Sequence, residues 1–188
     1  RNSGQTCVCV KRLYVQEGVY DQFLDKRATA VKALVVGDGT RSGVTEGPLS
    51  DAGALGKVGS MVEDALDNGG RLVVGGKPHA LGRTFYEPTV IADATSEMVL
   101  AREEIFGPVA AVFRFSTEAE AIALANDTEY GLAAYFYTAD LGRSVRVSEA
   151  LEYGIVGINE GLVTTEVAPF GGVKQSGMGR EGSKYGIE

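Results

Sequence analysis

The chain has 188 residues, of which 44% are hydrophobic and 23% charged, a balance typical of a globular protein with one domain or two very small ones. Its formal net charge of −7 argues against a protein of nucleic acids or anionic membrane surfaces, because both partners attract clustered Lys and Arg. No apolar run approaches the roughly 20 residues that a membrane span needs. With only two cysteines the chain is no disulfide scaffold, and a reducing, cytoplasmic compartment is favoured.

The first half of the chain alternates predicted strands and helices. The β-forming residues 11–16 predict a strand, and apolar residues recur at helical spacing over about 19–34. After a Gly-punctuated loop, a second helix is predicted over about 52–67, with Ser50 as its N-cap and Gly69 at its end. Further strands are predicted over 71–76, 86–93 and 108–115.

The second half continues this alternation. Thr117, with Glu120 three residues later, has the pattern of a capping box before an Ala-rich helix over 118–126. A further helix over about 141–153 is expected to stop at Gly154. Strands are predicted over 132–138 and 154–159, and a Gly-rich coil over 169–186. Strands that alternate with helices predict an α/β fold on a largely parallel sheet, and the lack of any linker predicts a single domain over 1–188.

Both cysteines stand in the stretch GQTCVC, residues 4–9. A thiolate rather than a thiol is the nucleophile, and a free Cys with a pKa of about 8.5 is mostly protonated at neutral pH unless its surroundings help. The small and polar residues 2–6 would let a substrate approach Cys7 and leave backbone N–H groups for a developing oxyanion. The alternative, favoured by the residue types alone, makes Cys7 and Cys9 small apolar residues of a core strand.

The sequence gives little support for a metal site, a hydrolase active site or a phosphate-binding loop. A structural zinc ion needs four ligands, whereas the chain offers Cys7, Cys9 and one histidine, so we predict no metal. That histidine, His79, is predicted to lie in an exposed turn, which argues against a Ser–His–Asp or Cys–His site. The stretch GGVKQSGMG does not match a phosphate-binding loop, because Gly177 is followed by Met178, and we interpret it as surface coil.

Three motifs occur in an order and at separations that resemble the aldehyde dehydrogenase superfamily: GQTCVC (4–9), EEIFGPV (103–109) and PFGGVKQSGMGRE (169–181). The resemblance covers nearly all 188 residues, and RNSGQTCVC, NEGL, EVAPFGG and GREGSKYGIE resemble bacterial members that oxidise succinate semialdehyde. It implies a Rossmann-like α/β catalytic domain. The missing initiator Met and closing tail indicate a fragment, which would lack an upstream cofactor-binding domain and general base and a downstream oligomerisation strand. We expect negligible activity of the isolated chain and a homo-oligomer for the whole protein.

The resemblance also implies a reaction. Cys7 would attack the aldehyde carbon to give a thiohemiacetal, hydride would pass to NAD or NADP, and the resulting thioester would be hydrolysed. The backbone N–H of Cys7 would help to hold the oxyanion. Glu104 would hydrogen-bond the nicotinamide ribose, and Phe106 would lie near the nicotinamide ring. For a lone Phe, packing in the core is nearly as strong an interpretation.

Selection of a small semialdehyde substrate is implied to depend on charge. Arg1 would clamp the carboxylate at the far end of succinate semialdehyde, and Phe170 would line the substrate tunnel. Thr164 stands where close relatives carry a serine, and its added methyl group leaves open another carboxylated semialdehyde, such as glutarate semialdehyde. The alternatives are a surface arginine at a chain end and a loop threonine.

Cys9 is not expected to be catalytic. In some close relatives the equivalent thiol forms a disulfide with the nucleophile and switches activity off. A pair two residues apart would need a loop rearrangement to reach disulfide geometry, so a packed spectator is the alternative. A non-catalytic, redox-sensitive thiol domain is the competing hypothesis from another functional class.

Overall fold

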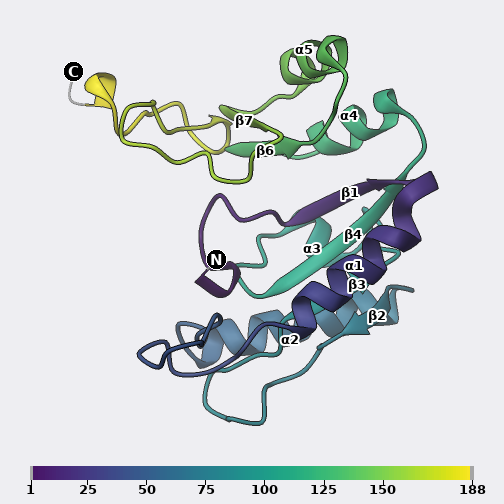
Figure 1. Ribbon diagram of the computed structural model, residues 1–188, viewed down its shortest axis with the longest axis vertical. Coiled ribbons are helices and arrows are strands. Elements are labelled where there is room, and N and C mark those ends of the chain that lie inside the picture. The colour runs from purple at the N-terminus through teal and green to yellow at the C-terminus, as the bar shows by residue number, and fades with distance from the viewer. Residues whose placement is uncertain (1, 187–188) are drawn as a thin grey trace. The chain divides into compact units, whose positions relative to one another are not determined.

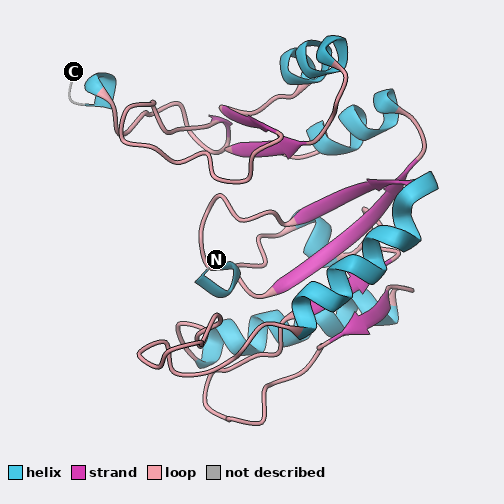
Figure 2. Cartoon of the chain, in the orientation of Figure 1, coloured by secondary structure: helices cyan, strands magenta, loops and turns pink. Residues whose placement is uncertain are grey.

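A computed structural model describes residues 2–186 of the chain. The chain forms two compact units, Arg1–Ser116 and Thr117–Glu188, which are described in turn. Both units contain helices and strands (Figure 2). Within the described residues, no helix combines the length and the apolar character that a membrane crossing requires.

The first unit is built on a four-stranded sheet in the order β1-β4-β3-β2 (Figure 1). The pairing of β1 (Arg12–Gln16) with β4 (Val109–Phe115) is parallel, and so is that of β4 with β3 (Thr89–Ala92). The edge strand β2 (Arg71–Val74) is antiparallel to β3. The predicted α/β fold with a largely parallel sheet is therefore confirmed.

Helices cover both faces of this sheet, and successive strand residues serve the two faces in turn. Even-numbered residues of β3 and β4 pack against α1 (Tyr20–Lys32), and odd-numbered residues pack against α2 (Ala52–Asp67) and the short α3 (Val99–Arg102). Apolar residues therefore follow one another without interruption over 90–92 in β3 and over 109–113 in β4, as expected of strands that are buried on both sides. The two cores contain Val90, Ala92, Ala110 and Val112 on the α1 face, and Ile91, Val109, Ala111 and Phe113 on the other.

Several predicted boundaries need correction. The helix α2 has the predicted bounds, but its N-cap is Asp51 and not Ser50, because the Asp51 Oδ1 atom accepts the Ala54 N–H at 2.8 Å. The strand predicted over 71–76 ends at Val74, since the next two residues are glycines with positive φ. The helix α3 has only four residues, too few to give a periodic signal, and was not predicted.

Over residues 117–186, the second unit contains two small sheets and two α-helices. The parallel pair is β6 (Ala133–Phe136) with β7 (Ile155–Ile158), and the antiparallel pair is β5 (Tyr130–Gly131) with β8 (Val173–Lys174). The tail predicted as coil over 169–186 therefore holds one strand, and it also holds the 3₁₀ turn η3 (Lys184–Gly186). The other elements are α4 (Glu118–Asn126) and α5 (Leu141–Ala150).

In the second unit, α4 begins where predicted, whereas α5 ends earlier than predicted. Thr117 caps α4 as predicted, because its Oγ1 atom accepts the Glu120 N–H at 3.2 Å. The helix α5 ends at Ala150 rather than near 153. Its C-cap, Leu151, has already left the helical region, with φ −78° and ψ 127°.

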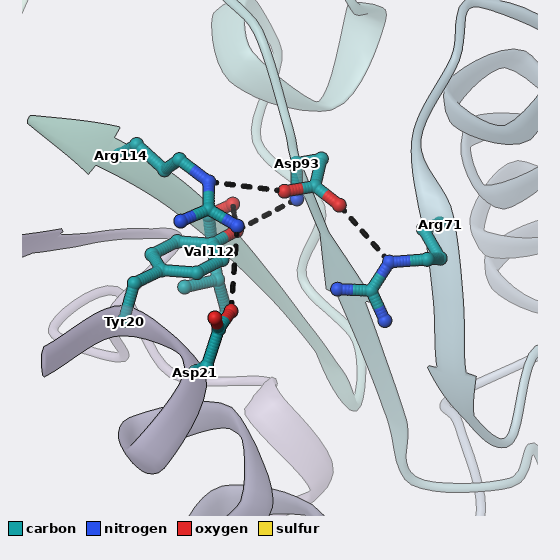
Figure 3. A network of polar contacts seen from close by, with 6 residues as sticks. All are labelled: Tyr20, Asp21, Arg71, Asp93, Val112 and Arg114. Carbon is teal, nitrogen blue, oxygen red and sulfur yellow. Dashed lines mark hydrogen bonds and ion pairs between the residues drawn. The ribbon is translucent and has the colours of Figure 1, made fainter. Parts of the chain in front are cut away.

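A polar cluster closes the carboxyl edge of the first unit's sheet (Figure 3). Tyr20 is fully buried; its hydroxyl donates to the Val112 carbonyl at 3.0 Å and accepts the Asp93 N–H at 2.7 Å. The Arg114 guanidinium lies 3.6 Å from the centre of the Tyr20 ring. The Asp93 carboxylate bridges Arg114 at 3.3 Å and Arg71 at 3.0 Å. Burial raises the pKa of Tyr20, so its hydroxyl keeps the proton that it donates.

Candidate active site

Cys7 lies in a turn between the 3₁₀ helix η1 (Asn2–Gly4) and β1. Cys7 is exposed and Cys9 is half-buried, and both are free thiols. Neither cysteine belongs to a strand or to the core. The alternative that both are core-strand residues is therefore wrong, although the residue types alone favoured it.

The polar residues before Cys7 anchor its loop to the segment that leads into α2. Ser3 is buried, and its hydroxyl donates to the Gly47 carbonyl at 2.9 Å. The Gln5 side chain donates to the Pro48 carbonyl at 3.1 Å and accepts the Ser50 N–H at 2.9 Å. Sequence reasoning assigned these residues to substrate access and missed this anchoring role.

Within the loop, Cys7 is exposed, whereas Cys9 contacts Thr6. The Cys9 N–H donates to the Thr6 carbonyl at 3.0 Å, and the Cys9 Sγ atom lies 2.7 Å from Thr6 Oγ1. Across residues 2–186, no acceptor is paired with the backbone N–H of Cys7. An exposed thiol beside an unpaired N–H is the arrangement that attack on a carbonyl carbon requires.

The segment 103–107 lies at the same edge of the sheet as the Cys7 loop. Because β1 and β4 are parallel neighbours, with Arg12 opposite Ala111, the loops that precede them meet at one edge. Gly4 packs on the Gly107 carbonyl so closely that a Cβ atom at Gly4 would clash with it. The structure thus brings Cys7 and the segment that carries Glu104 and Phe106 together.

Phe106 has an unusual backbone conformation within this segment. Its φ of 50° is left-handed, which a bulky side chain rarely adopts, and its side chain is 42% exposed. Its neighbours Ile105 and Gly107 are buried, whereas Phe106 itself is exposed, so the interpretation of Phe106 as a core residue is wrong. Such backbone outliers gather at functional sites, where the surrounding structure holds them. Glu104, two residues earlier, is exposed.

Lys11 also belongs to this edge, and sequence reasoning did not select it. Its ammonium donates to the Arg102 carbonyl, at 3.1 Å, where α3 ends. Burial is the main cause that lowers the pKa of Lys11 to about 8, with a further contribution from Arg12. Glu104 and Glu103 act in the opposite direction, which places their carboxylates within electrostatic range of the ammonium.

The remaining predicted site residues lie elsewhere. Thr164 is exposed in a loop of the second unit, and Phe170 is half-buried there, its backbone exchanging two hydrogen bonds with Glu181 at 2.8 and 2.9 Å. Arg1 lies outside the described residues. His79 lies in a turn as predicted but is half-buried and not exposed; its Nδ1 atom accepts the Leu81 N–H at 3.2 Å within that turn.

The whole chain, residues 1–188, matches the aldehyde dehydrogenase family. A match of this extent shows that the chain belongs to that family. A glutarate-semialdehyde dehydrogenase of Pseudomonas aeruginosa is 61% identical to it, and a succinate semialdehyde dehydrogenase of Acinetobacter baylyi is 60% identical, both over all 188 residues. The chain spans 39% of the length of each of these relatives.

Solved structures agree with this assignment. The crystal structure of succinate-semialdehyde dehydrogenase from Burkholderia pseudomallei has a TM-score of 0.98 at 61% identity, covering 100% of this chain and 39% of that one. A Methanocaldococcus jannaschii glyceraldehyde-3-phosphate dehydrogenase complexed with NADP has a TM-score of 0.93 at 37% identity, covering 99% and 40%. A Staphylococcus aureus betaine aldehyde dehydrogenase in complex with NAD⁺ has a TM-score of 0.95 at 38% identity, covering 99% and 38%. The predicted aldehyde dehydrogenase fold is therefore confirmed.

Proposed function

We propose that the protein to which this chain belongs oxidises succinate semialdehyde to succinate with NAD or NADP, and that Cys7 is its nucleophile. The observation that carries the proposal is the exposed Cys7 thiol on an anchored loop, beside the segment with Glu104 and Phe106. Relatives at 60–61% identity, which by name act on semialdehydes of four- and five-carbon dicarboxylates, support this substrate class.

In this proposal the chain's own residues perform the covalent chemistry. The Cys7 sulfur forms a bond to the aldehyde carbon, the carbonyl electron pair moves to oxygen, and the Cys7 N–H stabilises that oxyanion. After loss of hydride the carbon is a thioester, and water breaks its C–S bond to release the acid and the thiol. Aldehyde, water and oxidised cofactor thus become acid, reduced cofactor and one proton.

The residues beside Cys7 fit a nicotinamide dinucleotide. Glu104 offers an exposed carboxylate, which can accept hydrogen bonds from both hydroxyls of a ribose, and Phe106 offers an exposed ring. When bound, the cofactor supplies a nicotinamide ring that accepts the hydride. Glu104 would hold its ribose, and Phe106 would limit the movement of the ring.

Three further residues are proposed to bind the substrate: the chain's first residue and two residues of the second unit. We propose that Arg1 and Thr164 bind the distal carboxylate and that Phe170 contacts the substrate. Glutarate semialdehyde is the second candidate substrate, supported by the relative at 61% identity. Because one extra methylene changes discrimination only about 10–200-fold, the ratio of kcat/KM for the two semialdehydes decides between them.

The whole protein would extend beyond this chain. We propose that residues 1–188 form the catalytic part of a homo-oligomeric enzyme whose cofactor-binding part comes from other residues of the polypeptide. On this view the isolated chain has negligible dehydrogenase activity. Steady production of reduced cofactor by the 188-residue chain alone would contradict this view.

The test replaces each cysteine in the complete protein. Cys7→Ala should reduce kcat for succinate semialdehyde by at least roughly 1,000-fold, because no other group supplies the nucleophile. Cys9→Ala, a matched change two residues away, should stay within about threefold of the wild type. Reduced cofactor is measured by its absorbance at saturating aldehyde. Activity that survives in Cys7→Ala would overturn the proposed function.

A further inference from the structure

Lys11 connects two loops that are distant in sequence. It stands immediately before β1, and its Nζ atom donates to the carbonyl of Arg102, 91 residues further along the chain. Arg102 is the last residue of α3, where helix carbonyls lack partners within the helix and a nearby cation is favourable. The contact therefore satisfies a carbonyl at the point where the segment 103–107 begins.

The same segment is held at its other end by the Cys7 loop. Gly4 packs against the carbonyl of Gly107, and only the absence of a Cβ atom permits this approach. Gly4 and Lys11 flank Cys7 on its two sides. The loop that presents the thiol therefore holds the beginning and the end of the segment that carries Glu104 and Phe106.

We propose that Lys11 is a positioning residue, which fixes Glu104 and Phe106 relative to Cys7 so that a bound ribose and nicotinamide align with the nucleophile. The inference rests on the proposed function, because it assumes that Glu104 and Phe106 meet the cofactor. Lys11 itself touches neither cofactor nor substrate in this role. Loss of its contact should affect cofactor binding, whereas aldehyde binding should remain unchanged.

The charges around Lys11 make the contact sensitive to pH. Arg12 on β1 and Lys57 on α2 face it with like charge, and Glu103 and Glu104 face it with opposite charge. With a pKa of about 8, Lys11 is mostly protonated at pH 7 and mostly neutral at pH 9. A neutral amine is a weaker donor to the Arg102 carbonyl and no longer attracts the two carboxylates.

The experiment uses the complete protein with Lys11→Met, Lys11→Arg and the control Lys57→Met. Lys57 is an exposed lysine on α2 that is close enough to influence Lys11. Lys11→Met should raise KM for the cofactor about tenfold, because Glu104 and Phe106 lose their fixed position. KM for the aldehyde should stay within about twofold of the wild-type value. Lys11→Arg should restore cofactor KM to within about threefold, and Lys57→Met should match the wild type.

The pH dependence gives a second readout, which a merely structural lysine would not change. The wild-type KM for the cofactor should rise between pH 7 and 9, whereas Lys11→Arg should show no rise, since a guanidinium stays charged. Equal cofactor KM in Lys11→Met and the wild type would overturn the inference, and so would an equal rise with pH in Lys11→Arg. Both outcomes differ from failure of the proposed function, which would appear as wild-type protein that does not oxidise the semialdehyde.

Discussion

The two edges of the first unit's sheet differ in whether their functional groups are paired or exposed. At the carboxyl edge, the Tyr20 hydroxyl, the Asp93 carboxylate and the Arg114 guanidinium satisfy one another around a fully buried ring. At the amino edge, the Cys7 thiol is exposed and the Phe106 ring is exposed on a left-handed backbone. One edge has its polar groups paired, and the other keeps reactive groups available.

This difference shows that the fold class alone would place the candidate active site at the wrong edge of the sheet. Open α/β sheets commonly bind ligands beyond the carboxyl ends of their strands. Here that edge is filled by the Tyr20 cluster, whereas the candidate nucleophile precedes β1 and the candidate cofactor residues precede β4. The function must therefore be argued from the site and not from the architecture.

Gly4→Ala should produce the largest effect of the changes that test this contrast. The new Cβ atom would clash with the Gly107 carbonyl, and the residue also needs its φ of 75°. The Cys7 loop would have to move, and a displacement of about 1 Å costs on the order of 100-fold in kcat in the complete protein.

Gly43→Ala is the matched control, because Gly43 has a φ of 83° but no atom near its Cβ position. It measures the cost of the left-handed backbone alone, through denaturant unfolding and kcat. If both alanine variants lose the same activity, the contact between Gly4 and Gly107 does not position the loop.

Tyr20→Phe should affect stability at the carboxyl edge and leave the amino edge unchanged. The Val112 carbonyl would keep the Ala94 N–H as a donor at 3.1 Å, but the Asp93 N–H would lose its acceptor. The expected loss is about 1–2 kcal/mol in the free energy of unfolding, measured with urea, with kcat unchanged. A large loss of kcat in the folded variant would show that the two edges are coupled.

Lys11→Met should change the pH dependence of stability at the amino edge. Because folding lowers the pKa of Lys11 from 10.5 to about 8, the unfolded chain binds more protons than the folded chain between these values. Lys11 therefore makes stability rise with pH from about 8 to 10.5, and the variant should lack this part of the rise. Parallel stability curves for the two proteins across this range would contradict the assignment.

Local signals explain which parts of the fold were predictable. The helical period placed α2 at its observed bounds, and Thr117 marked the start of α4, because both signals act within one or two helical turns. The elements α3 and β8 escaped prediction because about one turn of helix and a two-residue strand are too short to show a period. The Asp51 cap was missed because its neighbour Ser50 is an equally good capping residue type.

The sequence by itself determined the α/β class of the fold, the family motifs and the candidate roles of Cys7, Glu104 and Phe106. Only the tertiary structure decided that Cys7 is exposed, that Gly4 meets Gly107 and that Lys11 reaches Arg102. These contacts depend on the parallel pairing of β1 with β4, strands about 100 residues apart in the chain. Periodicity and capping act between near neighbours, whereas the order of strands in a sheet is set by packing of the whole unit.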